Sequence, residues 1–485
     1  MESMPEYWLT RLVLQRGLAL VYLIAFLVAL NQFRPLCGEN GLLPAPMFIR
    51  ETPFRYAPSI FHLFPRDEAF AAFAWIGVLL AVLAVTGVSE RFGIWASVLV
   101  WTLLWVIYLS FVNVGQTFYG FGWETMLLES GFLAIFLGAA DTQPQAMAIW
   151  LFRWVLFRVM FGAGLIKLRG DPCWRDLTCL DYHFETQPMP NPLSWYFHWL
   201  PGWLHKAGVI FNHLAELVAP LFCFAPQPVA ASAGIIMILF QGSIMISGNF
   251  SWLSLMTIVL AFSTLDNSLL SWFLPITPPQ MAPPLQFHIA ATRGLALLVV
   301  ILSVKPVRNL ISKRQIMNTS FDPYHLVNSY GAFGSITKER YEIIIEGTGD
   351  AVVTSSTVWK EYGFKGKPGD PGRMAPQIAP YHLRLDWLMW FAAMPSGFYD
   401  PWFIHLLKRL LDGDAATLAL LKDNPFPAAP PLQVRALHYR YRFTSPVERR
   451  RTRVWWRREL AATYFPAVSL SDPVLRNLLQ RLGYQ

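Results

Sequence analysis

Residues 149–192 read IWLFRWVLFRVMFGAGLIKLRGDPCWRDLTCLDYHFETQPMPNP, an apolar run followed by a segment dense in polar and aromatic residues. The run 149–168 has the length that a helix needs to cross a bilayer, roughly 20 mostly apolar residues. The segment after it carries two of the four cysteines of the chain, Cys173 and Cys179. Membrane-length runs that alternate with aromatic loops therefore decide the fold.

The composition agrees with a membrane protein. Hydrophobic residues make up 54% of the 485 residues and charged residues 14%, whereas soluble domains carry roughly 25% charge. A chain of this length is expected to form two or more units. We assign its net charge of +8 to membrane topology and to contact with lipid headgroups, and expect no nucleic acid as a partner. Met1 to Arg16 lacks a cleavage site of small residues, so the first apolar run is expected to stay as an anchor.

Residues 1–304 are predicted to form a polytopic α-helical membrane bundle with ordered loops at 34–69 and 169–207. Eight or nine transmembrane helices are expected, at 17–33, 70–88, 93–112, 121–139, 149–168, 208–225, 229–247, 252–270 and 288–304. The weakest candidates are 121–139, which contains Glu124 and Glu129, and 252–270, which ends early at Asp266.

A basic linker, 305–319, is expected to lead into a soluble, mostly β C-terminal domain at 320–485 that packs close to the membrane. Residues 437–443 alternate between apolar and polar side chains, a period typical of a half-buried strand. Residues 341–346 and 358–364 are also predicted as strands. A helical insertion at 384–422 interrupts them.

Ionisable residues inside the apolar runs are costly at membrane depth and usually face a partner or a cavity. One interpretation is structural, with a buried charge network formed by Glu129, Arg153, Arg158 and Asp266. The other is a polar cavity whose candidate catalytic residues are Lys167, Glu124, Glu216 and His213. Glu216 lies three residues after His213, on the same helix face, and is expected to meet Arg153 or Arg158.

Motifs of soluble enzymes are not found. The chain has neither a Gly-x-Ser-x-Gly elbow nor a His-Glu-x-x-His motif, and its histidines are scattered, although His183 and His198 share one loop. No metal and no cofactor are therefore expected.

Several stretches in order along the chain carry a family likeness. They are YWLTRLVLQRGLALVYLIAFLVALNQF at 7–33, GENGLLPA at 38–45, KLRGDPCWRDLTCLDYHFETQPMPNPLSWYFHWLP at 167–201, SGNFSWLSLMTIVLAFSTLDN at 247–267, VNSYGAFGSITKERYEIIIEGT at 327–348, APYHLRLDWLMWFAAM at 379–394 and NPFPAAPPLQVRALHYRYRFT at 424–444. Together they resemble the lipase maturation factor family. The resemblance implies a membrane-bound folding factor for secreted lipases or other exported hydrolases, chaperone-like and not an enzyme. It also implies the endoplasmic reticulum membrane in a eukaryote and the inner membrane in a bacterium.

A second, shorter likeness lies in FGAGLIKLRGDPCW at 161–174. It is similar to the lysine-bearing stretch of vitamin K-dependent carboxylase and its HTTM-type relatives, where the lysine belongs to the active site. This likeness implies an alternative function, a membrane enzyme that acts on a lipid or lipid-linked substrate through an intramembrane polar cavity. The alternative, structural interpretation of Lys167 is a side chain that extends from the end of a helix to the membrane–water interface.

The cysteines and tryptophans of the loops leave further alternatives open. Five residues separate Cys173 from Cys179, so the pair is a disulfide candidate in an oxidising compartment, but two free thiols or a redox pair are also compatible. The candidates for client contact are Trp174, Trp195, Trp199, Trp387 and Trp390, and interfacial anchoring is the alternative role for these rings. The oligomeric state is left open.

Membrane orientation is the point on which two predictions disagree. Family topology places the loops 34–69 and 169–207 and the C-terminal domain on the lumenal or periplasmic side. These segments carry more Arg and Lys residues than the opposite side does. The positive-inside rule alone therefore favours the inverse orientation.

Overall fold

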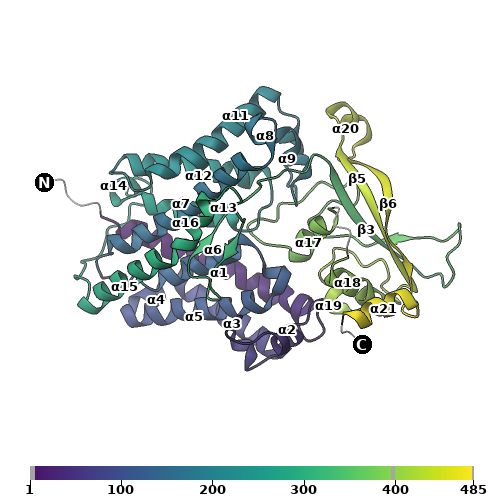
Figure 1. The fold of residues 1–485 in the computed structure, drawn as a ribbon, viewed down its shortest axis with the longest axis horizontal. Helices are drawn as coiled ribbons and strands as arrows, with labels where there is room; N and C mark the ends of the chain where they lie inside the picture. The colour runs from purple at the N-terminus through teal and green to yellow at the C-terminus, as the bar shows by residue number, and fades with distance from the viewer. Residues whose placement is uncertain (1–5, 395–398, 483–485) are drawn as a thin grey trace.

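The computed structural model describes residues 6–394 and 399–482, and it divides the chain into a helical part and a part built on a sheet (Figure 1). The helical bundle occupies the left of Figure 1 and contains the N-terminal end of the chain. The sheet and its helices lie on the right.

Six helices of the described residues are long and apolar enough to cross a membrane, judged by length and composition. They are α1 (Trp8–Cys37), α3 (Asp67–Val85), α5 (Ile94–Val114), α7 (Ala146–Arg169), α12 (Val229–Ser247) and α15 (Gln286–Leu302), the last continuing into α16 (Val304–Ile311). Close approach requires glycine at one contact of α1 with α3, because a Cβ at Gly77 would overlap the Phe26 ring.

The expected number of eight or nine spans is not reproduced by this criterion. The expected spans 121–139, 208–225 and 252–270 fall on shorter elements, namely α6 (Gly122–Ala134), α11 (Gly202–His213) with the π-helical and 3-10 turns η3 (Leu214–Val218) and η4 (Ala219–Phe222), and α13 (Leu253–Ala261) with η5 (Phe262–Thr264). A helix the length of α6 rises only about 20 Å, less than the ~30 Å hydrocarbon core. Pro220 removes a backbone donor where α11 loses its regular geometry.

The two ordered loops are helical in part. Loop 34–69 contains α2 (Ala45–Glu51) and η1 (Ile60–His62), and loop 169–207 contains α8 (Pro172–Arg175), α9 (Leu180–Thr186) and α10 (Ser194–His198). Short connecting elements elsewhere in the bundle are α4 (Val88–Arg91), η2 (Gln116–Tyr119) and α14 (Asn267–Leu270).

The C-terminal domain is an antiparallel sheet covered by helices, which corrects the expectation of a mostly β domain. Its strand order is β4 (Lys360–Glu361), β3 (Arg340–Thr348), β5 (Gln433–Phe443) and β6 (Trp456–Val468). The expected strand at 358–364 is thus only two residues long. The helices are α17 (Arg384–Ala392), α18 (Pro401–Asp412), α19 (Ala415–Leu418), α20 (Pro446–Thr452) and α21 (Pro473–Arg481), and a small ladder of β1 (Thr319–Ser320) and β2 (Asn328–Ser329) precedes the sheet.

Buried polar groups join the two parts. Arg384 at the start of α17 forms an ion pair with Glu124 of α6 at 2.7 Å, with both side chains fully buried. Arg340 of β3 donates to the carbonyls of Gln187 at 2.5 Å and Pro188 at 3.0 Å in loop 169–207. Asn249, in the turn between α12 and α13, also contacts both parts, because it donates to the carbonyls of Pro190 and Pro376 and accepts from the backbone N–H groups of Ile378 and Ala379.

Arg384→Met is expected to lower the free energy of unfolding by about 3–5 kcal/mol, because it leaves the Glu124 carboxylate buried without its partner. The double variant Glu124→Gln with Arg384→Met is expected to recover part of that loss. Thermal unfolding of the purified protein in detergent measures both changes. Lys408→Met is the control, since Lys408 pairs with Asp412 at the surface and its removal costs about 0.5 kcal/mol or less. Equal effects of Arg384→Met and Lys408→Met would contradict the role assigned to the buried pair.

Candidate functional site between the bundle and the C-terminal domain

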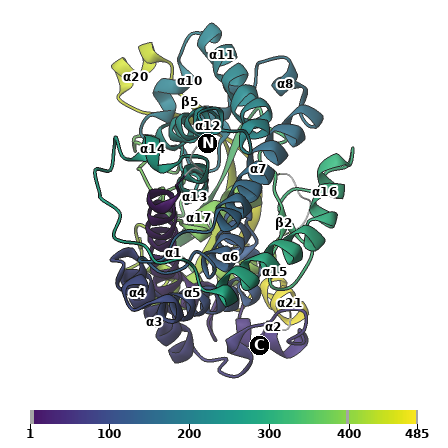
Figure 2. The same ribbon diagram turned by 90° about the vertical axis from the view of Figure 1, so that its left-hand side faces the viewer.

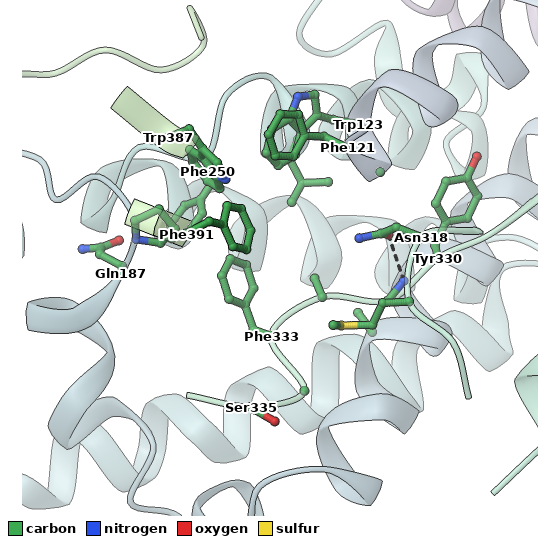
Figure 3. Close-up of a pocket in the computed structure, with 18 of the residues that line it drawn as sticks. Phe121, Trp123, Gln187, Phe250, Asn318, Tyr330, Phe333, Ser335, Trp387 and Phe391 are labelled. Atoms are coloured by element: carbon green, nitrogen blue, oxygen red, sulfur yellow. Dashed lines mark hydrogen bonds between the residues drawn. The ribbon is translucent and has the colours of Figure 1, made fainter. Parts of the chain in front are cut away.

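A cavity of about 710 Å³ lies between the two parts of the molecule (Figure 3). The bundle supplies walls from segment 117–121 and from α6, α7, η3, α12 and α13. Segments 183–188 and 317–337, α17 and the start of α18 supply the others. The volume falls within the range of ~300–1,000 Å³ that is usual for small-molecule sites.

Aromatic side chains form most of the cavity wall. Figure 3 shows Phe121 beside Trp123, and their rings stack with centroids 4.6 Å apart. Trp123 also meets the Trp387 ring edge to face at 5.0 Å. Phe250 and Phe333 lie together on another side of the cavity, 5.3 Å apart. The cavity is therefore suited to an apolar or amphipathic ligand.

A lysine and a glutamate stand in the wall near the end of α7. Lys167 Nζ donates to Glu216 Oε1 at 2.6 Å and to Asn212 Oδ1 at 2.8 Å. Asn212 Nδ2 in turn donates to Glu216 Oε2 at 3.0 Å. The expected pairing of Glu216 with Arg153 or Arg158 is therefore wrong. Arg158 lies nine residues before Lys167 on α7, about 13 Å along the axis, so Glu216 is level with Lys167 instead.

The terminal nitrogens of Arg158 have partners other than Glu216. Its guanidinium pairs with Glu129 and donates to the carbonyl of Asn328 at 2.6 Å. The hydroxyl of Tyr330 donates to the same Glu129 carboxylate at 2.7 Å. Residues after the last span thus complete a charge pair inside the bundle.

The other predicted charge sites have separate roles. Arg153 donates to the carbonyls of Ser263 at 2.8 Å and Cys223 at 3.2 Å. Asp266 accepts from the backbone N–H of Leu269 and caps α14. The His213 imidazole bonds the carbonyl of Trp174 at 3.0 Å. Of the four catalytic candidates, only Lys167 and Glu216 line the cavity, because Glu124 is held by Arg384 and by the Tyr108 hydroxyl.

Cys173 and Cys179 form a disulfide in the structure, with Cα atoms 4.8 Å apart. Asp171 caps the short helix α8 by accepting from the backbone N–H of Cys173 at 2.9 Å. The disulfide closes the loop directly after α7 and holds it against the segment that leads to β3, where Trp174 Nε1 donates to the carbonyl of Phe333 at 2.9 Å.

The five tryptophans proposed for client contact are distributed unequally. Trp174, Trp195 and Trp387 are buried, and Trp390 is half-buried with its Nε1 donating to the carbonyl of Thr186. Trp387 and Trp390 line the cavity. Trp199 is 42% exposed and is the one ring of the five with a large exposed fraction. Contact between a partner and Trp174, Trp195 or Trp387 at the outer surface is therefore not available in this conformation.

Sequence reasoning missed several residues that build the site. Arg384 and Arg340 fix the C-terminal domain to the bundle, and Gln241 and Ser254 line the cavity wall. Arg384 had one signal, a lone arginine within the apolar stretch 383–392. The described residues hold no group of three His, Cys, Asp or Glu side chains placed for a metal ion.

The fold and the cavity define a polytopic helical membrane protein whose C-terminal sheet domain is fixed to the bundle by buried charges. Residues 9–272 match the lipase maturation factor transmembrane domain, and residues 326–466 match the lipase maturation factor C-terminal domain. The chain belongs to the lipase maturation factor family.

Individual relatives cover nearly the whole chain. Lipase maturation factor 1 from Mus musculus and from Homo sapiens is in each case 42% identical over 96% of this chain, and the match covers 88% and 89% of those proteins. Lipase maturation factor 2 from Xenopus laevis is 31% identical over 99% of this chain and 85% of its own length. No solved structure matches the chain.

Lys167→Met is expected to destabilise the protein by about 3–5 kcal/mol, because the buried Glu216 carboxylate then keeps only the neutral Asn212 as a partner. Lys167→Met combined with Glu216→Leu is expected to regain much of the loss. Melting temperatures in detergent test this pair. A Lys167→Met variant as stable as the parent would show that the lysine is not a structural requirement.

The disulfide predicts the number of reactive thiols in the denatured chain. Unreduced denatured protein is expected to take up two alkyl groups, at Cys37 and Cys223, the two free cysteines. Denatured protein that has first been reduced is expected to take up four. Mass spectrometry of the intact chain counts them, and four groups without reductant would exclude the disulfide.

Proposed function

We propose that this protein is a membrane-bound maturation factor for secreted lipases or other exported hydrolases. The observation that carries the proposal is that the likeness to proteins named lipase maturation factor extends over both the bundle and the C-terminal domain. The buried pairs between these parts support it, because they make the chain a single unit of the kind that the relatives share.

An exposed aromatic surface on loop 169–207 is the proposed site of client contact. It consists of Leu193, Tyr196, Trp199, Leu200 and Trp203, which are all exposed. The end of strand β5 supports this surface, since the Nε1 groups of Trp195 and Trp199 both donate to the carbonyl of Thr444, the residue after β5. Exposed apolar surface of this kind marks interaction sites on proteins.

We place the C-terminal domain and the loop 169–207 on the side to which clients are exported. That side is the endoplasmic reticulum lumen in a eukaryote and the periplasm in a bacterium. The disulfide supports this orientation, because disulfides persist in oxidising compartments. The excess of basic residues opposes it, but Arg34 pairs with Asp67 at 3.5 Å and Arg169 donates to Leu310 and Gln315, so these cations belong to folded contacts.

A second candidate function is a membrane enzyme that acts on a lipid or lipid-linked substrate. The position of Lys167 in the wall of the cavity favours it. The ion pair with Glu216 and the hydrogen bond to Asn212 already engage its ammonium group. If the protein is such an enzyme, the Lys167→Met variant folds but has no activity on the lipid substrate. The maturation-factor function makes no such prediction, so this variant distinguishes the two functions.

Trp199→Ala together with Trp203→Ala is expected to lower the secreted activity of a co-expressed lipase several-fold. A maturation factor changes the fraction of client molecules that reach the native state, and small shifts in that fraction alter abundance several-fold. The measurement is secreted activity and secreted lipase mass in cells that lack the endogenous gene. The ratio of the two, the specific activity, is expected to stay constant along with the lipase transcript.

Trp272→Ala is the matched control, because Trp272 is 84% exposed and lies outside loop 169–207, just after α14. It is expected to leave secretion unchanged. A fall in specific activity at constant secreted mass would instead favour action on the native enzyme. Removal of the C-terminal domain after residue 315 is a poor test, since it also removes the partners of Glu124 and Glu129 inside the bundle.

A further inference from the structure

Several residues of the cavity wall have buried polar atoms without a hydrogen-bond partner among the described residues, and Gln241 and Ser254 are two of them. Gln241 on α12 is 6% exposed, and among the described residues its Oε1 has no hydrogen-bond partner. Its Nε2 meets only the sulfur of Met160, at 3.4 Å, which is a weak acceptor. Ser254 on α13 is 2% exposed, and its hydroxyl likewise finds no partner in the described part of the chain. Buried polar atoms are nearly always satisfied, so these two indicate a missing ligand or solvent.

A histidine of the same cavity points to the same conclusion. The His183 ring stacks on Phe250 with centroids 5.9 Å apart, and no hydrogen bond to its nitrogens is formed within the ranges 6–394 and 399–482. Burial, with a smaller contribution from the charge of Lys167, lowers the pKa of His183 to about 4. The ring is therefore neutral at pH 7 and offers one donor and one acceptor.

The charges of the cavity exclude some ligands. Its acidic and basic side chains are Lys167, Glu216 and Asp400, and the first two neutralise each other in one ion pair. Among the described residues, the cavity wall has no Lys or Arg side chain apart from Lys167, which is already paired with Glu216. A phosphate or carboxylate headgroup would be desolvated there without a counter-charge, which is costly, so a neutral polar group fits better.

One part of the cavity wall lies near α16, at the end of the last candidate membrane span. Met317 and Asn318 of the wall are exposed, and five residues separate Met317 from the end of α16 at Ile311. Figure 2 shows α16 at the edge of the bundle next to β2. Its surroundings combine exposed apolar residues with cations, namely Val304, Ile311 and Ile316 with Lys305, Arg308, Lys313 and Arg314. That combination is typical of helices at the headgroup level.

We propose that this cavity binds a neutral single-chain lipid of the monoacylglycerol class that enters from the membrane. The glycerol hydroxyl and ester groups bond Gln241, Ser254 and His183, and the acyl chain lies along the aromatic wall formed by Phe250, Phe333 and Trp387. A peptide segment fits less well, because each of its residues brings a backbone donor and an acceptor that need partners, and this wall is mostly apolar. The proposal is independent of the client of the proposed maturation activity.

The test is equilibrium binding of tritiated 1-oleoylglycerol to the full-length protein in phosphatidylcholine nanodiscs. Saturable binding at one site is expected, with sodium oleate at least tenfold weaker because it carries a carboxylate. Gln241→Leu with Ser254→Ala is expected to weaken 1-oleoylglycerol about tenfold, the loss for one to two hydrogen bonds. The same double variant is expected to leave the affinity for oleyl acetate, which lacks hydroxyl groups, within about threefold.

Ala163→Trp on α7 places a large ring in the cavity and is expected to abolish binding. Leu239→Trp on α12 is the control for the added ring, because the Leu239 side chain is 61% exposed. If Ala163→Trp does not fold, the double variant of Gln241 and Ser254 still decides. The proposal is overturned by the absence of saturable binding, by oleate that binds as tightly as 1-oleoylglycerol, or by equal losses in Leu239→Trp. It is also overturned if an apolar peptide displaces the probe while the double variant binds normally.

Discussion

The ion pair between Glu124 and Arg384 is the contact on which the rest of the structure depends. A carboxylate in the middle of the bundle is expensive without a partner, and its cation comes from 260 residues further along the chain. The guanidinium also lies over the Tyr119 ring, 3.5 Å from its centroid, and donates to the carbonyl of Phe118. The buried Glu124 carboxylate therefore has its cation only when α17 is docked, so docking of the C-terminal part stabilises the interior of the bundle.

The need of each buried charge for a partner also explains which features could be predicted from the sequence and which could not. The spans at 93–112, 149–168 and 229–247 are long, predominantly apolar runs, and the structure has helices there. Strand β5 follows from the alternation at 437–443, and β3 covers the strand expected at 341–346, although nearly all of its residues are buried. The pairing of Glu216 with Lys167 and of Glu124 with Arg384 could not be predicted, because pairing depends on the height of each residue along its helix and on a docking partner far away in sequence. Strand β6 could not be predicted, because its residues 456–463 are largely exposed and their sequence does not alternate clearly between apolar and polar side chains.

The sequence predicts client contact or membrane anchoring for the loop tryptophans, because composition alone cannot distinguish a membrane interface from an interface inside the molecule. Tryptophan and tyrosine are frequent at both kinds of boundary, where one side of the ring is apolar and the N–H or O–H group needs a partner. Trp195 and Trp390 satisfy that need with backbone carbonyls of a neighbouring segment. Trp387 turns toward the bundle and meets Trp123. The loops thus use their aromatic rings first to bind the two parts together, and only a subset remains exposed.

The polar groups between the bundle and the C-terminal domain also determine what kind of cavity lies between these two parts. Arg340 reaches the carbonyls of 185–188 and Asn249 reaches those of 190 and 376, so the walls on either side are tied together by directional bonds and not by apolar contact alone. Separating the C-terminal domain from the bundle would leave these buried donors and acceptors unpaired, each at a cost of about 1–3 kcal/mol. The cavity is accordingly preformed, and a ligand that enters it orders no further segment of the chain. Preformed sites retain more of their contact energy as affinity, which is why a small neutral ligand with few hydrogen bonds suffices to occupy this one.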